Sequence, residues 1–128
     1  MSRISKIEFT EIDRSLKNKY ILYTERNNYY IEYKTFSSLN SSCDKALISS
    51  AEYETIINHL QKYYKILTWE NVYESKDFTI NKNEWSITIY ENNLIKKEIV
   101  GNNNFPKNYN SFKNYFINKF NTLKIKNN

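Results

Sequence analysis

The sequence predicts an α+β fold, with a single antiparallel sheet of about six or seven strands packed by two amphipathic helices over residues 50–64 and 108–123. Two observations predict it. Short segments rich in β-branched and aromatic residues follow one another with Asn-rich turns between them, which is typical of β-hairpins. Two other segments repeat apolar residues every three or four positions, as amphipathic helices do. The chain has 128 residues, so we expect residues 1–128 to form a single domain.

Four strands are expected before the first helix. They are predicted over residues 4–12, 20–24, 29–36 and 43–48. A polar turn over residues 15–19 separates the first two, and a polar loop over residues 37–42 precedes the fourth. Asn27-Asn28 predicts a type I′ hairpin turn, because Asn tolerates the positive φ that such a turn needs.

A capping box predicts where the first helix begins. Ser49 is the expected N-cap, and Glu52 stands three residues further on. The apolar stripe that follows comprises Tyr53, Ile56, Ile57, Leu60 and Tyr64. We interpret this stripe as core-facing, with a partner groove as the alternative, and expect the helix to end near Lys65.

The second half of the chain predicts a hairpin and a closing helix. Residues 66–83 suit either one further strand or a structured loop, and strands are expected over 85–90 and 94–100 around an Asn92-Asn93 turn. Pro106 ends the extended chain, and Asn108 can cap the last helix. The core-facing stripe of that helix comprises Tyr109, Phe112, Phe116, Phe120 and Leu123.

Positive charge is concentrated at the end of the sequence. Residues 1–98 carry 14 basic and 14 acidic side chains, so the net charge of +5 comes from residues 99–128, which contain no acid. The lysines concerned are Lys107, Lys113, Lys119, Lys124 and Lys126. Such a basic edge attracts polyanions or acidic protein surfaces, although a simple solvated helix face is the alternative interpretation.

The side chains needed for catalysis or metal binding are scarce. Cys43 and His59 are the only cysteine and histidine, too few for a structural zinc site, and Cys43 suits a small apolar residue better than a nucleophile. The single glycine excludes a glycine-rich phosphate loop. We therefore expect no enzyme activity, no metal and no cofactor.

Tyrosine abundance suggests a protein-binding surface. The chain contains 12 tyrosines, and Tyr is enriched at interfaces because it is amphipathic and loses little entropy on contact. Tyr23, Tyr29, Tyr30, Tyr33, Tyr73 and Tyr90 cannot all be buried in a chain this small, so we expect some of them to form an exposed aromatic patch on the open face of the sheet. The partner-binding candidates among them are Tyr23, Tyr29, Tyr30 and Tyr33. The alternative is codon bias, since Asn, Lys, Ile and Tyr, which A/T-rich codons supply, make up half the chain and suggest an AT-rich bacterium or its phage.

One motif in the last third of the chain resembles a known pattern. A Trp-led strand at Trp85 is followed by Gly101, Asn103, Phe105 and Pro106 before the helix. This resembles small uncharacterised proteins of low-GC bacteria and their mobile elements, although the Gly often found just before the Trp is replaced here by Asn83-Glu84. The resemblance implies an architecture and no activity. Gly101 is expected where φ is positive or where backbone passes close to another element.

In size, composition and lack of catalytic residues the chain also resembles phage-encoded inhibitors of bacterial defence, anti-CRISPR proteins among them. The function this implies is non-catalytic occlusion of a larger host protein or protein–RNA complex. The alternative is a small nucleic-acid-binding module that uses the basic C-terminal helix. Without a signal-like or membrane-length apolar run, we expect a cytoplasmic protein with no membrane contact, and the oligomeric state stays open.

Overall fold

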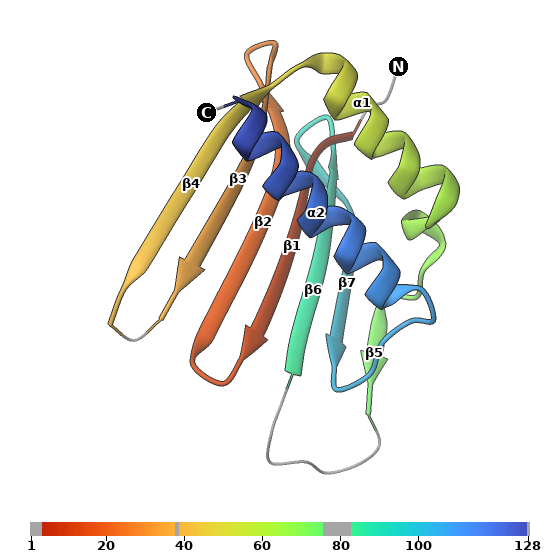
Figure 1. The fold of residues 1–128 in the computed structure, drawn as a ribbon. Helices are drawn as coiled ribbons and strands as arrows, with labels where there is room; N and C mark the ends of the chain where they lie inside the picture. Colours follow the sequence, from red (N-terminus) through yellow and green to blue (C-terminus); the bar gives the residue numbers. More distant parts are fainter. Residues whose placement is uncertain (1–3, 38, 76–82, 128) are drawn as a thin grey trace.

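A computed structural model describes residues 4–37, 39–75 and 83–127, which form one seven-stranded sheet with helices on one face (Figure 1). The strand order is β4-β3-β2-β1-β6-β7-β5. The strands are β1 (Ile4–Asp13), β2 (Leu16–Glu25), β3 (Asn28–Phe36), β4 (Ser41–Ile48), β5 (Val72–Glu74), β6 (Asn83–Glu91) and β7 (Leu94–Asn102). The helices are α1 (Ser50–Asn58), which continues as a π-helical turn over His59–Tyr63, and α2 (Tyr109–Asn127). A short 3₁₀ turn at Ile66–Thr68 lies between the π-helical turn and β5. The predicted α+β fold is confirmed.

The sheet is mixed, which corrects the expectation of a purely antiparallel one. Every pair of neighbouring strands is antiparallel except β5 and β7, which run parallel in a register that places Val72 opposite Val100. The reason is topological. β5 follows the helical segment and pairs with β7, which is not its neighbour in sequence, so no hairpin fixes its direction. Of residues 66–83, for which a strand and a structured loop were both left open, the structure describes 66–75 and 83, including the short strand β5, while residues 76–82 lie outside the described part.

Two-residue turns close the β2–β3 and β6–β7 hairpins. Arg26 and Asn27 both have positive φ, and so do Asn92 and Asn93, as a type I′ turn requires. The prediction was therefore correct at Asn92-Asn93 and one residue late at the first pair, because Asn28 already belongs to β3. The predicted polar turn over 15–19 is also shorter, since β2 starts at Leu16.

The first helix begins and packs as predicted. The hydroxyl of Ser49 accepts a hydrogen bond from the Glu52 amide at 3.0 Å, and the Glu52 carboxylate accepts one from the Ser49 amide at 2.8 Å. All members of its predicted stripe are buried. The hydroxyl of Tyr53 donates to the backbone oxygen of Ile4 at 2.6 Å, which fixes the helix against the start of β1. Lys65, at φ 52°, ends the helical segment.

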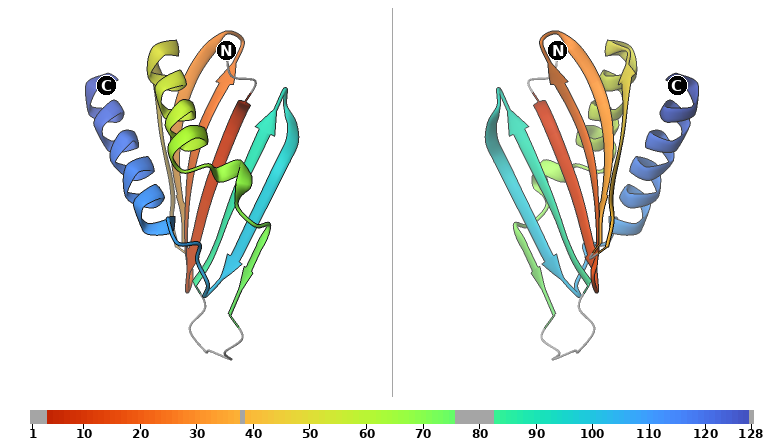
Figure 2. Two further views of the ribbon diagram at one scale, coloured as in Figure 1. Left: turned by 90° about the vertical axis from the view of Figure 1, so that its right-hand side faces the viewer. Right: turned by 90° about the vertical axis from the view of Figure 1, so that its left-hand side faces the viewer.

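The last helix completes the core. Its five predicted anchors are buried, and the rings of Phe112 and Phe116 lie 5.2 Å and 6.3 Å from the ring of Phe9 at the centre of the sheet. Burying such a side chain contributes roughly 1.5–3 kcal/mol. Both helices therefore cover the same face, and the other face of the sheet carries no helix (Figure 2). None of the described helices combines the length and apolar character of a membrane span.

The glycine–aromatic motif is structural. Gly101 does not have a positive φ, so close approach is the correct alternative: a Cβ there would overlap the Trp85 indole. The indole Nε1 donates to the backbone oxygen of Asn104 at 2.9 Å, and Phe105 stacks on the same ring at 6.2 Å. Asn103 takes the positive φ, 54°, and its side chain accepts a hydrogen bond from the Asn83 amide at 2.8 Å. The Pro106 oxygen accepts a hydrogen bond from the Tyr109 amide at 3.1 Å, where α2 begins.

Candidate functional site on the open face of the sheet

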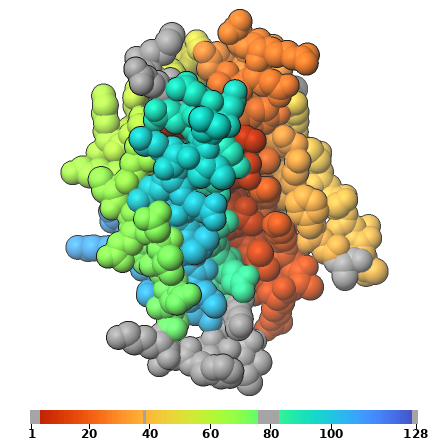
Figure 3. Space-filling view, turned by 180° about the vertical axis from the view of Figure 1, so that it is seen from behind, coloured from red at the N-terminus to blue at the C-terminus, as the bar shows by residue number. Residues whose placement is uncertain are grey.

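Figure 3 shows the face opposite the helices, and the strand registers align its side chains in rows that cross the sheet. On β1, Ile7 and Phe9 point into the core, so the alternate residues point away from the helices. The strand registers then align four rows, named here from the end of the sheet nearest the Asn92-Asn93 turn. They are the tyrosine row (Leu47, Tyr30, Tyr23, Lys6, Tyr90, Ile95), row 2 (Lys45, Glu32, Ile21, Glu8, Thr88, Glu98), row 3 (Cys43, Lys34, Lys19, Thr10, Ser86, Val100, Val72) and row 4 (Ser41, Phe36, Lys17, Ile12, Glu84, Asn102, Glu74).

The tyrosine row is an aromatic strip combined with lysines. The rings of Tyr23 and Tyr30 stack at 5.2 Å between centroids, and the Lys45 ammonium lies 4.3 Å from the Tyr30 centroid. The Lys6 ammonium lies 4.7 Å from the Tyr90 centroid. Partial burial raises the pKa of Tyr23, and a hydrogen bond to Tyr23 raises that of Lys45. The row thus offers flat rings held in place by their neighbours.

Only two of the four predicted tyrosines lie on this face. Tyr29 and Tyr33 point into the helix layer, where Tyr29 packs on Tyr53 at 4.9 Å and the Tyr33 hydroxyl donates to Asn18 at 2.8 Å. The prediction placed Tyr29 beside Tyr30 on one surface, which strand alternation forbids. The sequence could have shown this, because Tyr29 and Tyr33 lie two residues on either side of Ile31, which is buried, and residues two apart on a strand point to the same face.

Lys6 and Lys45 were missed because they come from distant strands, whereas Tyr90 was among the tyrosines considered for the exposed patch. Lys6 and Tyr90 are paired across β1 and β6, 84 positions apart in the sequence. Lys45 lies on β4, whose register no local pattern defines. Alternation along residues 85–90 puts Tyr90 on the same side as Thr88 and Ser86, and the register confirms that side as the open face.

The predicted basic edge of α2 is largely neutralised by acids from elsewhere in the chain. Three of its lysines form ion pairs, Lys113 with Glu11 at 3.0 Å, Lys124 with Asp44 at 2.6 Å and Lys126 with Glu52 at 2.9 Å. Lys119 lies over the Tyr115 ring, at 5.7 Å from its centroid. Lys107 is exposed at the turn before α2. The charge that is concentrated in sequence is therefore spread out in space, on the helix side of the sheet.

Charge on the open face is balanced but separated. Within the four rows, strands β2, β3 and β4 carry Lys17, Lys19, Lys34 and Lys45 against Glu32, a net charge of +3 that we call the basic half. Strands β5, β6 and β7 carry Glu74, Glu84 and Glu98, a net charge of −3 that we call the acidic half. β1 lies between them with Lys6 and Glu8, so the whole face has no net charge.

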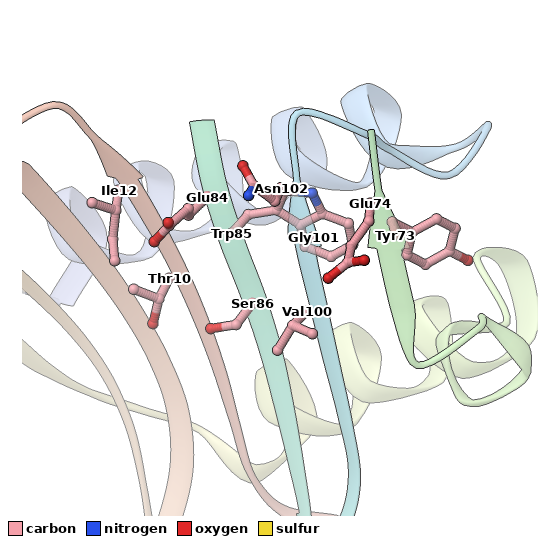
Figure 4. A pocket seen from close by; sticks show the side chains of 10 residues that line it. All are labelled: Thr10, Ile12, Tyr73, Glu74, Glu84, Trp85, Ser86, Val100, Gly101 and Asn102. Carbon is pink, nitrogen blue, oxygen red and sulfur yellow. The ribbon is translucent and has the colours of Figure 1, made fainter. Parts of the chain in front are cut away.

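A shallow cavity lies in the acidic half. Its volume is about 250 Å³, and Thr10, Glu74, Glu84, Val100 and Asn102 contribute to its lining (Figure 4). Asn102 also holds a buried side-chain oxygen without a hydrogen-bond partner among the described residues. The volume falls below the roughly 300–1,000 Å³ of small-molecule sites. At that size, the cavity is a hollow in the open face smaller than such sites.

The two candidate nucleophile and base residues lie on opposite sides of the sheet. Cys43 is exposed on the open face, and its thiol donates to Glu32 at 3.1 Å. This hydrogen bond raises the pKa of the thiol, which disfavours the reactive thiolate. His59 is stacked between Tyr63 and Tyr115 in the helix layer. Among the described residues, no cluster of three His, Cys, Asp or Glu side chains is arranged to hold a metal.

Comparisons of the chain with protein families, with curated proteins and with solved structures found no match. The function is therefore inferred from the surface itself.

Proposed function

We propose that the protein is a non-catalytic binding protein that docks a protein partner on the open face of its sheet. The observation that carries this proposal is the tyrosine row, where three tyrosines and two exposed aliphatic side chains cross six strands. Leu47 and Ile95, at its ends, are 54% and 58% exposed. Interfaces are enriched in Tyr, and the few residues that dominate binding energy are mostly aromatic or Arg.

The charge of the face favours a protein over a polyanion. A nucleic-acid surface needs a positive patch that neutralises phosphates. The basic half offers a net charge of +3, but the acidic half beside it carries −3 and would repel a polyanion lying across the face. Lys6 and Lys19 already contact Glu8, at 3.5 Å and 3.1 Å. A protein surface with charges of both signs matches this pattern better.

The finer form of the proposal is inhibition of a host defence nucleoprotein by a phage or mobile-element protein, in the manner of anti-CRISPR proteins, within the bacterial cytoplasm. It is supported by the small size, the aromatic surface and the poor inventory of catalytic side chains. In this form the open face occludes a functional surface of the larger complex, and Lys107 and Lys119 at the α2 edge meet acidic protein or guide backbone.

A nucleic-acid-binding module is the second candidate, favoured by the lysine–tyrosine pairs. Lys45 over Tyr30 and Lys6 over Tyr90 resemble the combination of base-stacking rings and cations found on single-strand-binding surfaces. Binding to single-stranded RNA or DNA with a steep salt dependence would support it. If no binding is seen at about 50 mM salt, the second candidate fails.

The proposal is tested by capture from the native host with matched variants. Tagged wild-type protein is compared with the double variant Tyr23→Thr/Tyr30→Thr, since Thr keeps strand propensity while removing both rings. Tyr63→Ala, on the helical segment and 65% exposed, is the control. We expect the double variant to lose the captured protein and the control to keep it, with circular dichroism showing that both fold. Undiminished capture by the double variant would refute the proposal.

A further inference from the structure

The cavity in the acidic half presents hydrogen-bond acceptors with no cation beside them. In row 4, Asn102 on β7 lies between Glu84 on β6 and Glu74 on β5, and each glutamate is its partner in the strand register (Figure 4). The described residues that line the cavity include no Lys, Arg or His. Neither glutamate forms an ion pair with a described residue. Electrostatic complementarity therefore favours a cationic group at this position.

Asn102 adds an acceptor that the fold itself does not use. Its side-chain oxygen is buried and has no hydrogen-bond partner among the described residues. Such atoms are rare, because a buried polar atom that is left unpaired costs free energy. A donor that enters the cavity would satisfy this oxygen. The observation is independent of the charge of the glutamates, and it points to a ligand that carries N–H groups.

The layout of the three acceptors favours a guanidinium over an ammonium group. Glu74 and Glu84 stand two strand spacings apart, which is roughly 10 Å along the row. A guanidinium is planar and carries five N–H donors in a fixed fork, so it can donate to groups on both of its sides at once. A lysine ammonium is a compact, strongly hydrated point charge on a flexible stem. Arginine is therefore the better match to Glu84, Asn102 and Glu74.

The size and lining of the cavity suit a single inserted side chain. Its volume is about 250 Å³, and Ile12 and Val100 contribute apolar surface to it. The methylene groups of a long cationic side chain pack on apolar surface of this kind while the charged end stays with its polar partners. Arginine is also one of the three residue types that most often dominate the binding energy of protein interfaces, where such residues fill pockets.

From these observations we infer that the cavity binds an arginine side chain of the protein partner, with its guanidinium between Glu74 and Glu84 and against the Asn102 side-chain oxygen. The inference rests on the proposed function and deepens it, because it states the chemistry of the partner. Row 4 lies three rows from the tyrosine row, which is about 20 Å along the strands. The partner surface then carries an arginine about 20 Å from the part that covers Tyr23 and Tyr30.

Titration of the purified protein with three small compounds tests the arginine site. The compounds are N-acetyl-arginine amide, N-acetyl-lysine amide and N-acetyl-citrulline amide, whose urea group has the shape of a guanidinium without its charge. In nitrogen–proton correlation NMR spectra, we expect the arginine compound to shift the side-chain amide of Asn102 and the backbone amides of Ser86 and Val100. The lysine compound should bind at least about threefold more weakly, and the citrulline compound should leave these signals in place.

Matched variants assign the contacts. Glu74→Gln/Glu84→Gln keeps the size of both side chains and should weaken binding of the arginine compound at least about tenfold. Glu25→Gln/Glu54→Gln makes the same charge change outside the cavity and should bind within about twofold of the wild type. Asn102→Val removes the acceptor while keeping strand propensity, and it should weaken binding at least about threefold. Circular dichroism checks that each variant folds.

Several results would overturn the arginine site. They are an absence of shifts up to about 50 mM of the arginine compound, shifts confined to other parts of the sheet, or a Glu74→Gln/Glu84→Gln variant that binds like the wild type. An arginine compound that binds no more tightly than the lysine or citrulline compound would also overturn it.

The proposed function fails separately from this site. If capture of a host protein is lost with Tyr23→Thr/Tyr30→Thr but undiminished with Glu74→Gln/Glu84→Gln, the docking face stands and the arginine contact falls. If the tyrosine variant captures its partner undiminished, the proposed function falls, and the NMR titration still decides whether the cavity binds arginine.

Discussion

The Trp85 indole occupies the space in which a side chain at Gly101 would begin, so these two residues on neighbouring strands form one packing unit. The indole is in turn held by a hydrogen bond to Asn104 and by contact with Tyr109, at 4.7 Å between ring centroids. This unit joins the β6–β7 pair to the start of α2.

Gly101→Ala should therefore destabilise the fold. The added methyl group must displace the indole or the β7 backbone, and overpacking of this kind typically costs about 1–3 kcal/mol. Urea denaturation followed by tryptophan fluorescence measures the loss. Val100→Ala, one residue away and exposed on the open face, is the matched control and should change stability by less than about 0.5 kcal/mol. An equally mild effect of Gly101→Ala would contradict the packing unit.

The protein should lose stability at alkaline pH through its buried tyrosines. Burial raises the pKa of Tyr53, and its hydroxyl donates to Ile4. A group whose folded pKa is raised stabilises the fold below its unfolded pKa, about 10 for Tyr, and this contribution is lost as pH rises toward the folded pKa. Denaturation midpoints should thus fall from about pH 9 to about pH 11.

Tyr53→Phe isolates this effect. The variant should be less stable at neutral pH, because the Ile4 oxygen loses its donor, yet its stability should fall less steeply above about pH 10. Tyr63→Phe, at an exposed position, should follow the wild-type profile. If the profiles of wild type and Tyr53→Phe run parallel, the Tyr53 hydroxyl does not govern the alkaline transition.

Ser49→Ala should cost about 1 kcal/mol by removing the N-cap of α1. Ser50→Ala, one position further along, removes no cap and should be nearly neutral. Thermal or urea unfolding distinguishes the two. The reciprocal hydrogen bond also lowers the pKa of Glu52, so its contribution should be lost as pH falls through that lowered value. Equal effects of the two serine substitutions would exclude the capping box as a source of stability.

Partner capture should depend less on the lysines of α2 than on the tyrosine row. Lys107→Glu/Lys119→Glu reverses the two α2-edge lysines that form no ion pair with described residues, and we expect a smaller loss of captured protein than for Tyr23→Thr/Tyr30→Thr. Lys113→Glu is unsuitable as a probe, because it would place a carboxylate beside Glu11. A larger loss in the lysine variant would move the binding surface from the open face to α2.

Local patterns were sufficient to predict six of the seven described strands and both helices. The stripe that includes Phe112 and Phe116, the capping box at Ser49 and the Asn92-Asn93 turn each depend on neighbours within a few residues. Local patterns could not predict that β5 runs parallel to β7, because residues 72–74 are too few to show alternation and their partner is distant in sequence.

The residues of the tyrosine row were predicted only in part, because their alignment also depends on strands that are distant in sequence. A surface row collects one side chain from each strand, so its composition depends on strand order and register. Tyr23 and Tyr30 come from one hairpin and were found together, whereas Lys6, Lys45 and Tyr90 come from three other strands. In the same way, the pairing of Lys124 with Asp44 is invisible to a count of charge along the sequence.

The strand order also has a consequence for synthesis. β1 is the first strand to leave the ribosome, but one of its two neighbours, β6, is complete only at Glu91. At about 5–20 residues per second, the β1 edge waits for roughly 4–16 s after the strand itself has emerged. During that interval β1 is the edge strand of the β1–β4 meander, paired with β2 on one side only, and the nascent chain is then most open to strand pairing with another chain.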